Sequence, residues 1–150
     1  MRKDAGFTLL ELITVIAIAG VLTAIAVPNF LTYQSSSRLK GALSTLRGDL
    51  VGARMLAIKR GVEYQVAFSS GGYQIIRGDL SSGSTFDPIN NTEVARDFAD
   101  EYPGVTVSGS SNPVFSPKGT VAAAPVTITL QNSQGSQTIT IYIAGKVKVN

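Results

Sequence analysis

Residue types that carry most enzyme chemistry are sparse in this sequence of 150 residues. It contains no histidine and no cysteine, which excludes imidazole bases, thiol nucleophiles, disulfides and most zinc sites. It also lacks a Gly-x-Ser-x-Gly elbow, a Ser-x-x-Lys signature and a phosphate-binding glycine loop. We therefore expect a protein that is not an enzyme, with no catalytic residue, no metal site and no cofactor.

Two groups of charged residues remain as candidates for binding. Four acids in the middle of the chain could offer oxygen ligands to Ca²⁺, but they lack the spacing of an EF-hand, and a solvated loop is the favoured interpretation. These acids are Glu93, Asp97, Asp100 and Glu101. Near the C-terminus, Lys146 and Lys148 could meet phosphates. Two lysines at this place are also typical of an exposed strand edge that is protected from pairing.

Glu11 is the most unusual of the ionisable residues. It lies inside the nearly unbroken apolar run "GFTLLELITVIAIAGVLTAIAVPNF". A charge deep in hydrocarbon costs about 2.5 to 3.5 kcal/mol on insertion scales. The sequence therefore predicts that some partner compensates this carboxylate.

The run that surrounds Glu11 is long enough to cross a membrane as a helix. At 1.5 Å per residue, residues 7–27 reach about 30 Å, the thickness of the hydrocarbon core. Arg2 and Lys3 precede the run, so the positive-inside rule places the N-terminus in the cytoplasm and the rest of the chain outside. We expect a single-pass protein with an exported domain.

Two other interpretations of this run stay open. An ordinary secretory signal peptide would account for the two leading cations, and Ala24-Ile25-Ala26 has the A-x-A form of a cleavage site. That interpretation would leave a soluble secreted domain. A buried core helix of a soluble protein fits less well, because the run is apolar on all sides and not along one stripe.

The start of the run resembles the class III signal of type IV pilins and of the pseudopilins of type II secretion. The pattern is Gly6-Phe7-Thr8-Leu9-Leu10-Glu11, after a short polar and basic leader. The resemblance implies that a prepilin peptidase cuts between Gly6 and Phe7 and methylates the new N-terminus at Phe7. It also implies that Glu11 pairs with the amine of an adjacent subunit during assembly in a filament.

The same resemblance implies a location and a set of partners. The chain would sit in the bacterial inner membrane, with its C-terminal domain in the periplasm, and would then enter a pilus or pseudopilus. Its partners would be other pilins or pseudopilins, the prepilin peptidase and an inner-membrane assembly platform. A long helix is also implied, with a kink at Pro28 inside it and not a stop there.

Beyond Pro28 the pattern becomes that of an amphipathic helix. Apolar residues recur at steps of four and three along one stripe, namely Leu39, Leu43, Leu46, Leu50, Ala53 and Ala57. A second stripe holds small residues, Gly41, Thr45, Gly48 and Gly52. These either let another backbone approach or only make the helix pliable. Gly61, after Lys59 and Arg60, predicts the end of the helix.

After Gly61 the periodicity changes from helical to alternating. "VEYQVAF" and "YQIIR", joined by "SSGG", predict a hairpin. Residues 78–93 are expected to form a surface loop, and short strands follow, with Ile139, Ile141 and Ile143 on one face. The predicted fold is α+β and type IV pilin-like, a long N-terminal helix packed against an antiparallel sheet or β-sandwich-like domain. The expected segments are a leader (1–6), a transmembrane and assembly helix (7–30), an amphipathic helix (31–60) and a β-rich periplasmic domain (61–150).

The last third of the chain is similar to the H-type pseudopilin and FimT-like minor pilin group. The similarity rests on Phe115-Ser116-Pro117-Lys118-Gly119 and on Ala144-Gly145-Lys146-Val147. It implies a structural subunit of a type II secretion pseudopilus or a type IV pilus. Some FimT-like proteins take up DNA through Gly-Arg-x-Arg, where this chain has Gly145-Lys146-Val147-Lys148. A DNA-binding minor pilin therefore stays open as the alternative, with the weaker phosphate geometry of lysine.

Overall fold

A computed structural model describes residues 8–69 and 71–150 of the chain. It contains two compact units, residues 1–34 and residues 35–150, which we describe separately. The helix α1 (Leu9–Arg60) contributes to both of them. Its long apolar start and the amphipathic pattern that follows belong to one continuous element, as the sequence predicts.

The described part of the first unit is the beginning of α1. Every residue from 8 to 33 is exposed, although most of them are apolar. None of the most apolar 18-residue window of this helix is buried, and its mean hydropathy is 2.4. The interpretation of this run as a core helix of a soluble protein is therefore wrong. Length and composition make it a helix that can cross a membrane.

The second half of α1 buries one stripe of small and medium apolar side chains. Of the predicted stripe, Leu46, Leu50, Ala53 and Ala57 are fully buried and Leu39 is nearly buried, whereas Leu43 is only partly buried. Ala42, which was not predicted, is also fully buried. The helix ends at Arg60, and Gly61 follows with φ of 70° and donates its N–H to the carbonyl of Ala57 at 3.0 Å. This is the C-terminal glycine that the sequence predicts.

The first antiparallel sheet has the strand order β3-β2-β1-β5. Its members are β1 (Tyr64–Ser69), β2 (Gly72–Arg77), β3 (Thr92–Asp97) and β5 (Val114–Phe115). The β1 and β2 hairpin confirms the prediction from alternation. The strand β3 was not expected, because its sequence "TEVARD" has one strongly apolar residue and reads as a polar segment. It forms because it pairs with β2 along the edge of the sheet.

A short helix follows β3 where no helix was expected. It is α2 (Phe98–Glu101), and Asp97 caps it by accepting a hydrogen bond from the backbone N–H of Ala99 at 2.8 Å. Phe98 is fully buried. Its ring packs edge to face on Tyr73, with a centroid distance of 5.5 Å, and on Tyr102, at 5.4 Å. This aromatic anchor positions a segment whose acidic composition alone suggests a loop.

The second antiparallel sheet has the order β4-β6-β7-β8. Its strands are β4 (Thr106–Gly109), β6 (Val126–Asn132), β7 (Gly135–Ile141) and β8 (Val147–Val149). Ile139 and Ile141 are fully buried, as predicted, but Ile143 is 63% exposed. The expectation for Ile143 was wrong because β7 ends at Ile141 and the alternation ends with it.

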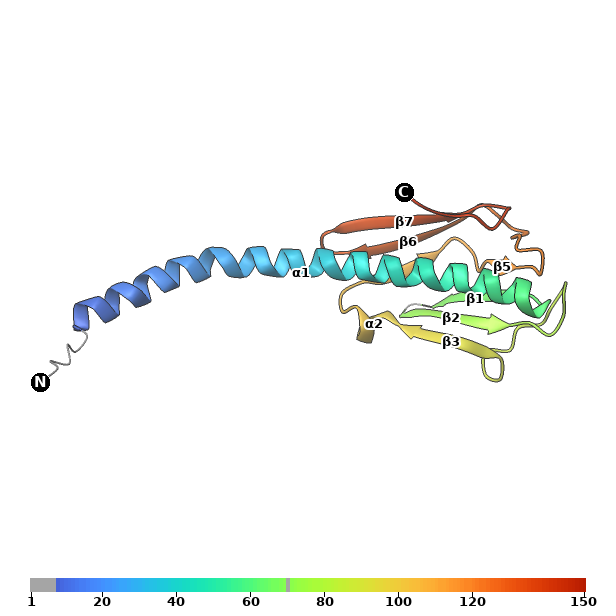
Figure 1. Cartoon of the computed structure of the whole chain (residues 1–150), viewed down its shortest axis with the longest axis horizontal. Coiled ribbons are helices and arrows are strands. Elements are labelled where there is room, and N and C mark those ends of the chain that lie inside the picture. The colour runs from blue at the N-terminus through green and yellow to red at the C-terminus, as the bar shows by residue number, and fades with distance from the viewer. Residues whose placement is uncertain (1–7, 70) are drawn as a thin grey trace, which may run out of the picture. The chain divides into compact units, whose positions relative to one another are not determined.

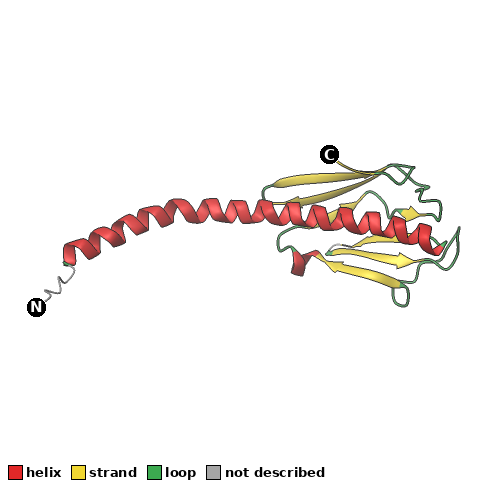
Figure 2. Cartoon of the chain, viewed as in Figure 1, coloured by secondary structure: helices red, strands yellow, loops and turns green. Residues whose placement is uncertain are grey.

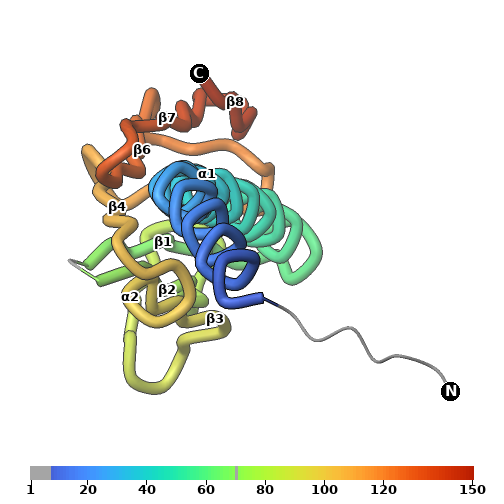
Figure 3. The backbone as a smooth tube through the Cα atoms, turned by 90° about the vertical axis from the view of Figure 1, so that its left-hand side faces the viewer, coloured from blue at the N-terminus to red at the C-terminus, as the bar shows by residue number. Residues whose placement is uncertain are grey.

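The two sheets and the second half of α1 enclose one core. Viewed along the helix, Figure 3 shows β6, β7 and β8 on one side of α1, with β1, β2, β3 and α2 on the other. Figure 1 and Figure 2 show the strands of both sheets running alongside this part of the helix. Leu50 of α1, Ile75 of β2 and Ile128 of β6 belong to one buried cluster. The observed fold is thus the predicted α+β arrangement, with two four-stranded sheets.

Candidate functional site

At the start of α1, the threonine hydroxyl groups form hydrogen bonds within the helix itself. Among the residues described there, the one polar side chain without such a bond is that of Glu11. Thr8 caps the helix by accepting a hydrogen bond from the backbone N–H of Glu11 at 3.2 Å. Thr14 and Thr23 donate their hydroxyl hydrogens to carbonyls one turn earlier, at 2.8 and 2.7 Å. Such bonds satisfy hydroxyl groups within the helix itself. In a membrane or between packed helices, these threonines therefore cost little.

The exception is the carboxylate of Glu11. It lies on an exposed part of the helix, and among the described residues it has no salt bridge. Its neighbours Leu10, Leu12 and Val15 are 76%, 56% and 56% exposed. A charged carboxylate in an apolar surface is costly to bury, and a cation carried by the surface that covers it removes most of that cost. The predicted sites at Gly6 and Phe7 lie outside the described residues.

Pro28 lies inside α1 and does not end it. Hydrogen bonds from side chains support the helix on either side of it. The amide of Asn29 donates to the carbonyl of Ile25 at 3.1 Å, and the hydroxyl of Thr32 donates to the carbonyl of Pro28 at 3.1 Å. The kink itself stays a prediction from the missing N–H of proline.

In the second unit, Asp49 joins α1 to the first sheet. Its Oδ2 accepts a hydrogen bond from the hydroxyl of Tyr73 at 2.8 Å and one from Nε of Arg96 at 2.9 Å. Burial and the contact with Asp49 raise the pKa of Tyr73, so the phenol stays a donor. The hydrogen bond to Asp49 raises the pKa of Arg96. The cluster fixes the helix on β2 and β3.

The small residues of α1 divide into two pairs. A Cβ at Gly41 would meet Cε1 of Tyr102 at 3.0 Å, and the hydroxyls of Thr45 and Tyr102 are 2.7 Å apart. Gly41 and Thr45 therefore contact the side chain of Tyr102. A Cβ at Gly48 or Gly52 would meet no atom within 4 Å. Nothing in the described part of the chain covers these two glycines.

Arg54 holds together the two C-terminal motifs singled out in the sequence. Its Nε donates to the carbonyl of Gly119 at 3.0 Å, and its Nη2 donates to the carbonyl of Ala144 at 3.1 Å. A Cβ at Gly145 would lie 2.0 Å from that Gly119 oxygen. Glycine is therefore required where the two turns touch, and Gly145 also has φ of 69°. The motifs are structural, and sequence spacing alone does not show that they meet.

These turns carry the two lysines predicted as possible DNA contacts. Lys146 lies in a turn closed by a hydrogen bond from the N–H of Tyr142 to the carbonyl of Lys146, at 3.0 Å. Lys148 lies on the edge strand β8, opposite Thr140. Both side chains are exposed. The geometry suits a protected strand edge, and contact with DNA stays a prediction.

The acids considered for Ca²⁺ are used in other ways. Glu93 forms a salt bridge with Arg60, and Glu101 forms one with Arg96 at 3.3 Å. Asp97 caps α2. Within residues 8–69 and 71–150, no group of three or more acidic residues is arranged to hold a metal ion. The interpretation of this segment as a solvated loop was wrong for β3 and α2.

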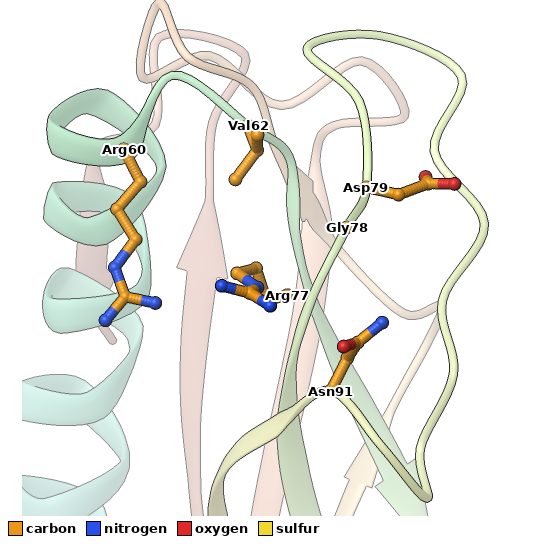
Figure 4. Close-up of a pocket in the computed structure, with 6 residues that line it drawn as sticks. All are labelled: Arg60, Val62, Arg77, Gly78, Asp79 and Asn91. Carbon is orange, nitrogen blue, oxygen red and sulfur yellow. The ribbon is translucent and has the colours of Figure 1, made fainter.

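A pocket of about 510 Å³ opens at the end of α1. Figure 4 shows the residues that line it, Arg60, Val62, Arg77, Gly78, Asp79 and Asn91. Arg60 already pairs with Glu93, and Asp79 accepts hydrogen bonds from the backbone and hydroxyl of Thr85, both at 3.0 Å. The lining offers two guanidinium groups, one carboxylate and one amide, from Arg60 and Arg77, Asp79 and Asn91.

Known proteins are similar to this chain in two ways, through the sequence of its N-terminal segment and through the fold of the larger part. Residues 1–27 match the family model of the prokaryotic N-terminal methylation motif. The type IV major pilin protein PilA of Myxococcus xanthus is 47% identical over 45 residues, which cover 30% of this chain and 20% of PilA. A fimbrial protein of Pseudomonas aeruginosa is 43% identical over 44 residues, 29% of each chain. The chain thus spans less than a third of these relatives.

Solved structures share the fold at low sequence identity. The type IV minor pilin FimU of Pseudomonas aeruginosa has a TM-score of 0.55 and 19% identity, over 79% of this chain and 92% of FimU. The minor pseudopilin EpsH from the type 2 secretion system of Vibrio cholerae has a TM-score of 0.54 and 12% identity, over 75% and 96%. Residues 42–145, well over half of the chain, match the family model of type II transport protein GspH. The chain therefore belongs to the GspH family, and it carries a prokaryotic N-terminal methylation motif ahead of the GspH region.

Proposed function

We propose that this chain is a structural subunit of a type II secretion pseudopilus or a type IV pilus. It is first cut between Gly6 and Phe7 by a prepilin peptidase, which methylates Phe7. The match of residues 1–27 to the methylation motif supports this step. The proposal includes no catalysis by the chain itself.

The observation that carries the proposal is the carboxylate of Glu11. It is the only charged side chain between Phe7 and Arg38, and the described residues offer it no cation. Cleavage after Gly6 would create a positive amine one helical turn away. In a filament, the amine of a neighbouring subunit would neutralise Glu11, so burial of the apolar helix would favour assembly over isolated chains.

The same segment sets the proposed location. Before assembly, the apolar part of α1 spans the inner membrane once, with Arg2 and Lys3 in the cytoplasm and residues 35–150 in the periplasm. The chain then moves from the membrane into the filament through an assembly platform. Other pilins or pseudopilins are its neighbours there.

Replacement of Glu11 tests the assembly role directly. We expect Glu11→Ala to be inserted and cut normally but to fall at least about tenfold in the filament fraction, which corresponds to about 1.4 kcal/mol. Thr14→Ala is the matched control, because the Thr14 hydroxyl bonds to its own helix and should not be needed. Immunoblots of membrane and sheared filament fractions measure both variants.

Mass spectrometry of the mature N-terminus tests the processing step. The expected first residue is N-methylated Phe7. A mature chain that begins at Val27 would instead identify an ordinary signal peptide and reject the proposal. Normal incorporation of Glu11→Ala would reject the charge pair even if the cleavage is as proposed.

A further inference from the structure

The outward side of α1 in the second unit carries an exposed apolar patch. Val51, Met55 and Ile58 follow one another at steps of four and three, so they form one stripe of the helix. They are 41%, 64% and 51% exposed, whereas Leu50 and Ala57 on the opposite side are fully buried. We call these three residues the helix patch. The uncovered Gly48 and Gly52 lie beside it and leave room for another side chain.

Three cations lie next to residues that border the helix patch. The turn at Gly119 touches the patch, since a Cβ on Gly119 would lie 2.9 Å from Cδ1 of Ile58. Lys118 is next to that glycine, and Lys146 is next to Gly145, which contacts the same turn. Arg47 is one residue from Gly48 on the helix. We call Lys118, Lys146 and Arg47 the basic rim; all three are exposed and none forms a salt bridge with a described residue.

The same chain presents a surface with the opposite charge and a similar apolar centre. In the loop 78–91, Ile89 is 88% exposed and Leu80 is 53% exposed. Asp79 and Asp87 lie in this loop and form no salt bridge with a described residue. Hydrogen bonds from Thr85 and from Asn90 lower the pKa of Asp79 and of Asp87, so both stay charged near neutral pH.

The loop 78–91 is an ordered support for Ile89. Oδ1 of Asp87 accepts hydrogen bonds from the backbone N–H groups of Ile89, at 2.8 Å, and of Asn90, at 3.3 Å. The N–H of Asn91 donates to the carbonyl of Asp87 at 3.0 Å. A large apolar side chain is thus held on a hydrogen-bonded turn, and the described residues leave it 88% exposed. Rigid exposed apolar side chains with a polar surround are typical of interface centres.

We propose that the loop 78–91 of one copy of this chain docks on the helix patch of a second copy, with Ile89 seated beside Met55. Asp79 and Asp87 then face the basic rim of the neighbour. Charge complementarity selects this occupant, because the rim consists of three cations and the loop presents two carboxylates that form no salt bridge with a described residue. A nucleic acid could match the rim but would leave the apolar centre uncovered. The inference rests on the proposed function, for which it names the neighbouring subunit.

The two surfaces are different parts of the molecule, so the contact is heterologous. Each copy can accept one neighbour on its helix patch and offer its loop to another. Contacts of this kind build open helical arrays unless the rotation closes a ring. The docking would therefore add a lateral contact between the globular units to the contacts made by the apolar helices.

Disulfide formation between single-cysteine variants tests the contact in the full-length chain. The chain has no cysteine, so Met55→Cys and Ile89→Cys introduce the only thiols. We expect a mixed disulfide when the two differently tagged variants are expressed together and oxidised in membranes or filaments. Neither variant alone should form a dimer. Gln134→Cys, in an exposed turn away from both surfaces, should form none with Ile89→Cys.

Charge reversal gives a second readout. Lys146→Glu should lower the mixed disulfide yield about threefold to fivefold, the effect of one exposed ion pair. Asp87→Lys in the partner chain should restore much of it. Chains that reach the filament fraction without a mixed disulfide would overturn the docking and leave the proposed function intact. Absence from that fraction would reject both. DNA retardation by the full-length chain that is lost in Lys146→Glu, without a mixed disulfide, would assign the rim to nucleic acid and overturn the docking.

Discussion

At the scale of single residues, α1 shows how surroundings decide the effect of a glycine. Gly41 and Gly52 are eleven positions apart, which is close to three helical turns, so they lie on the same side. A Cβ at Gly41 would press on the Tyr102 ring at 3.0 Å, whereas a Cβ at Gly52 would meet nothing within 4 Å. Glycine inside a helix costs about 1 kcal/mol relative to alanine. Gly52 therefore carries that cost, and no contact with the described residues explains it.

Gly52→Ala should raise the free energy of unfolding by about 1 kcal/mol, because it lowers the helix cost without a clash. Gly41→Ala is the matched control and should give a smaller gain or a loss, since Tyr102 must move. The full-length variants are unfolded with urea in detergent, and circular dichroism monitors the transition of the second unit. The two unfolding curves give both changes in free energy. Equal stabilisation by the two changes would contradict the packing of Tyr102 on Gly41.

At the scale of elements, Asp49 is the polar contact that aligns α1 with β2 and β3. The Tyr73 ring is 1% exposed and its hydroxyl bonds to Asp49 at 2.8 Å. Arg96 reaches the same oxygen from β3. Apolar burial holds the helix on the sheets, but it tolerates small shifts along the helix axis. Hydrogen bonds to one carboxylate oxygen are directional and select one register.

Tyr73→Phe should lower the free energy of unfolding by about 1 kcal/mol, the usual net value of one hydrogen bond. The aromatic packing on Phe98 would be kept, and Arg96 would still neutralise Asp49. Tyr142→Phe is the control, because Tyr142 is 41% exposed. It should change stability by no more than a few tenths of a kcal/mol. A Tyr73→Phe protein as stable as the original would show that Asp49 does not set this register.

At the scale of the whole molecule, the two units differ in whether they contain a hydrophobic core. All the buried hydrophobic residues of the described chain lie between Leu39 and Ile141, within the unit 35–150. The described residues of the first unit contribute no core of their own. Charge is also uneven, because no acid follows Glu101 while Lys118, Lys146 and Lys148 do. We therefore expect the unit 35–150 to fold by itself, and the apolar start of α1 to be covered by lipid or by neighbouring helices.

A chain that begins at Ser35 should therefore fold alone and stay in solution. We expect a single cooperative unfolding transition, since a unit of this size with one core is usually two-state. The full chain should instead stay in the membrane pellet after alkaline carbonate extraction. A truncated chain that unfolds without cooperativity, or that aggregates as soon as it is made, would show that residues 1–34 contribute to the core.

Local patterns in the sequence were sufficient for the elements that depend only on neighbouring residues. The apolar run predicts α1, the Leu stripe predicts its buried side, and Gly61 predicts its end. The β1 and β2 hairpin follows from alternation around a glycine turn. The motif from Gly6 to Glu11 predicts processing, which no residue of the described structure tests. Each of these signals is a helical or alternating period, or a short motif that is complete within a few residues.

Only the tertiary structure decided which distant residues meet. β3 forms because it pairs with the edge of β2. α2 is held in place because the ring of Phe98 packs on Tyr73. Arg54 brings Gly119 and Gly145 together although they are 26 positions apart. Contacts of this kind depend on strand order and register, which composition and local periodicity do not encode. For the same reason, the sequence names Lys146 only as a possible phosphate contact, whereas the fold places it in the turn that Arg54 holds beside Gly119.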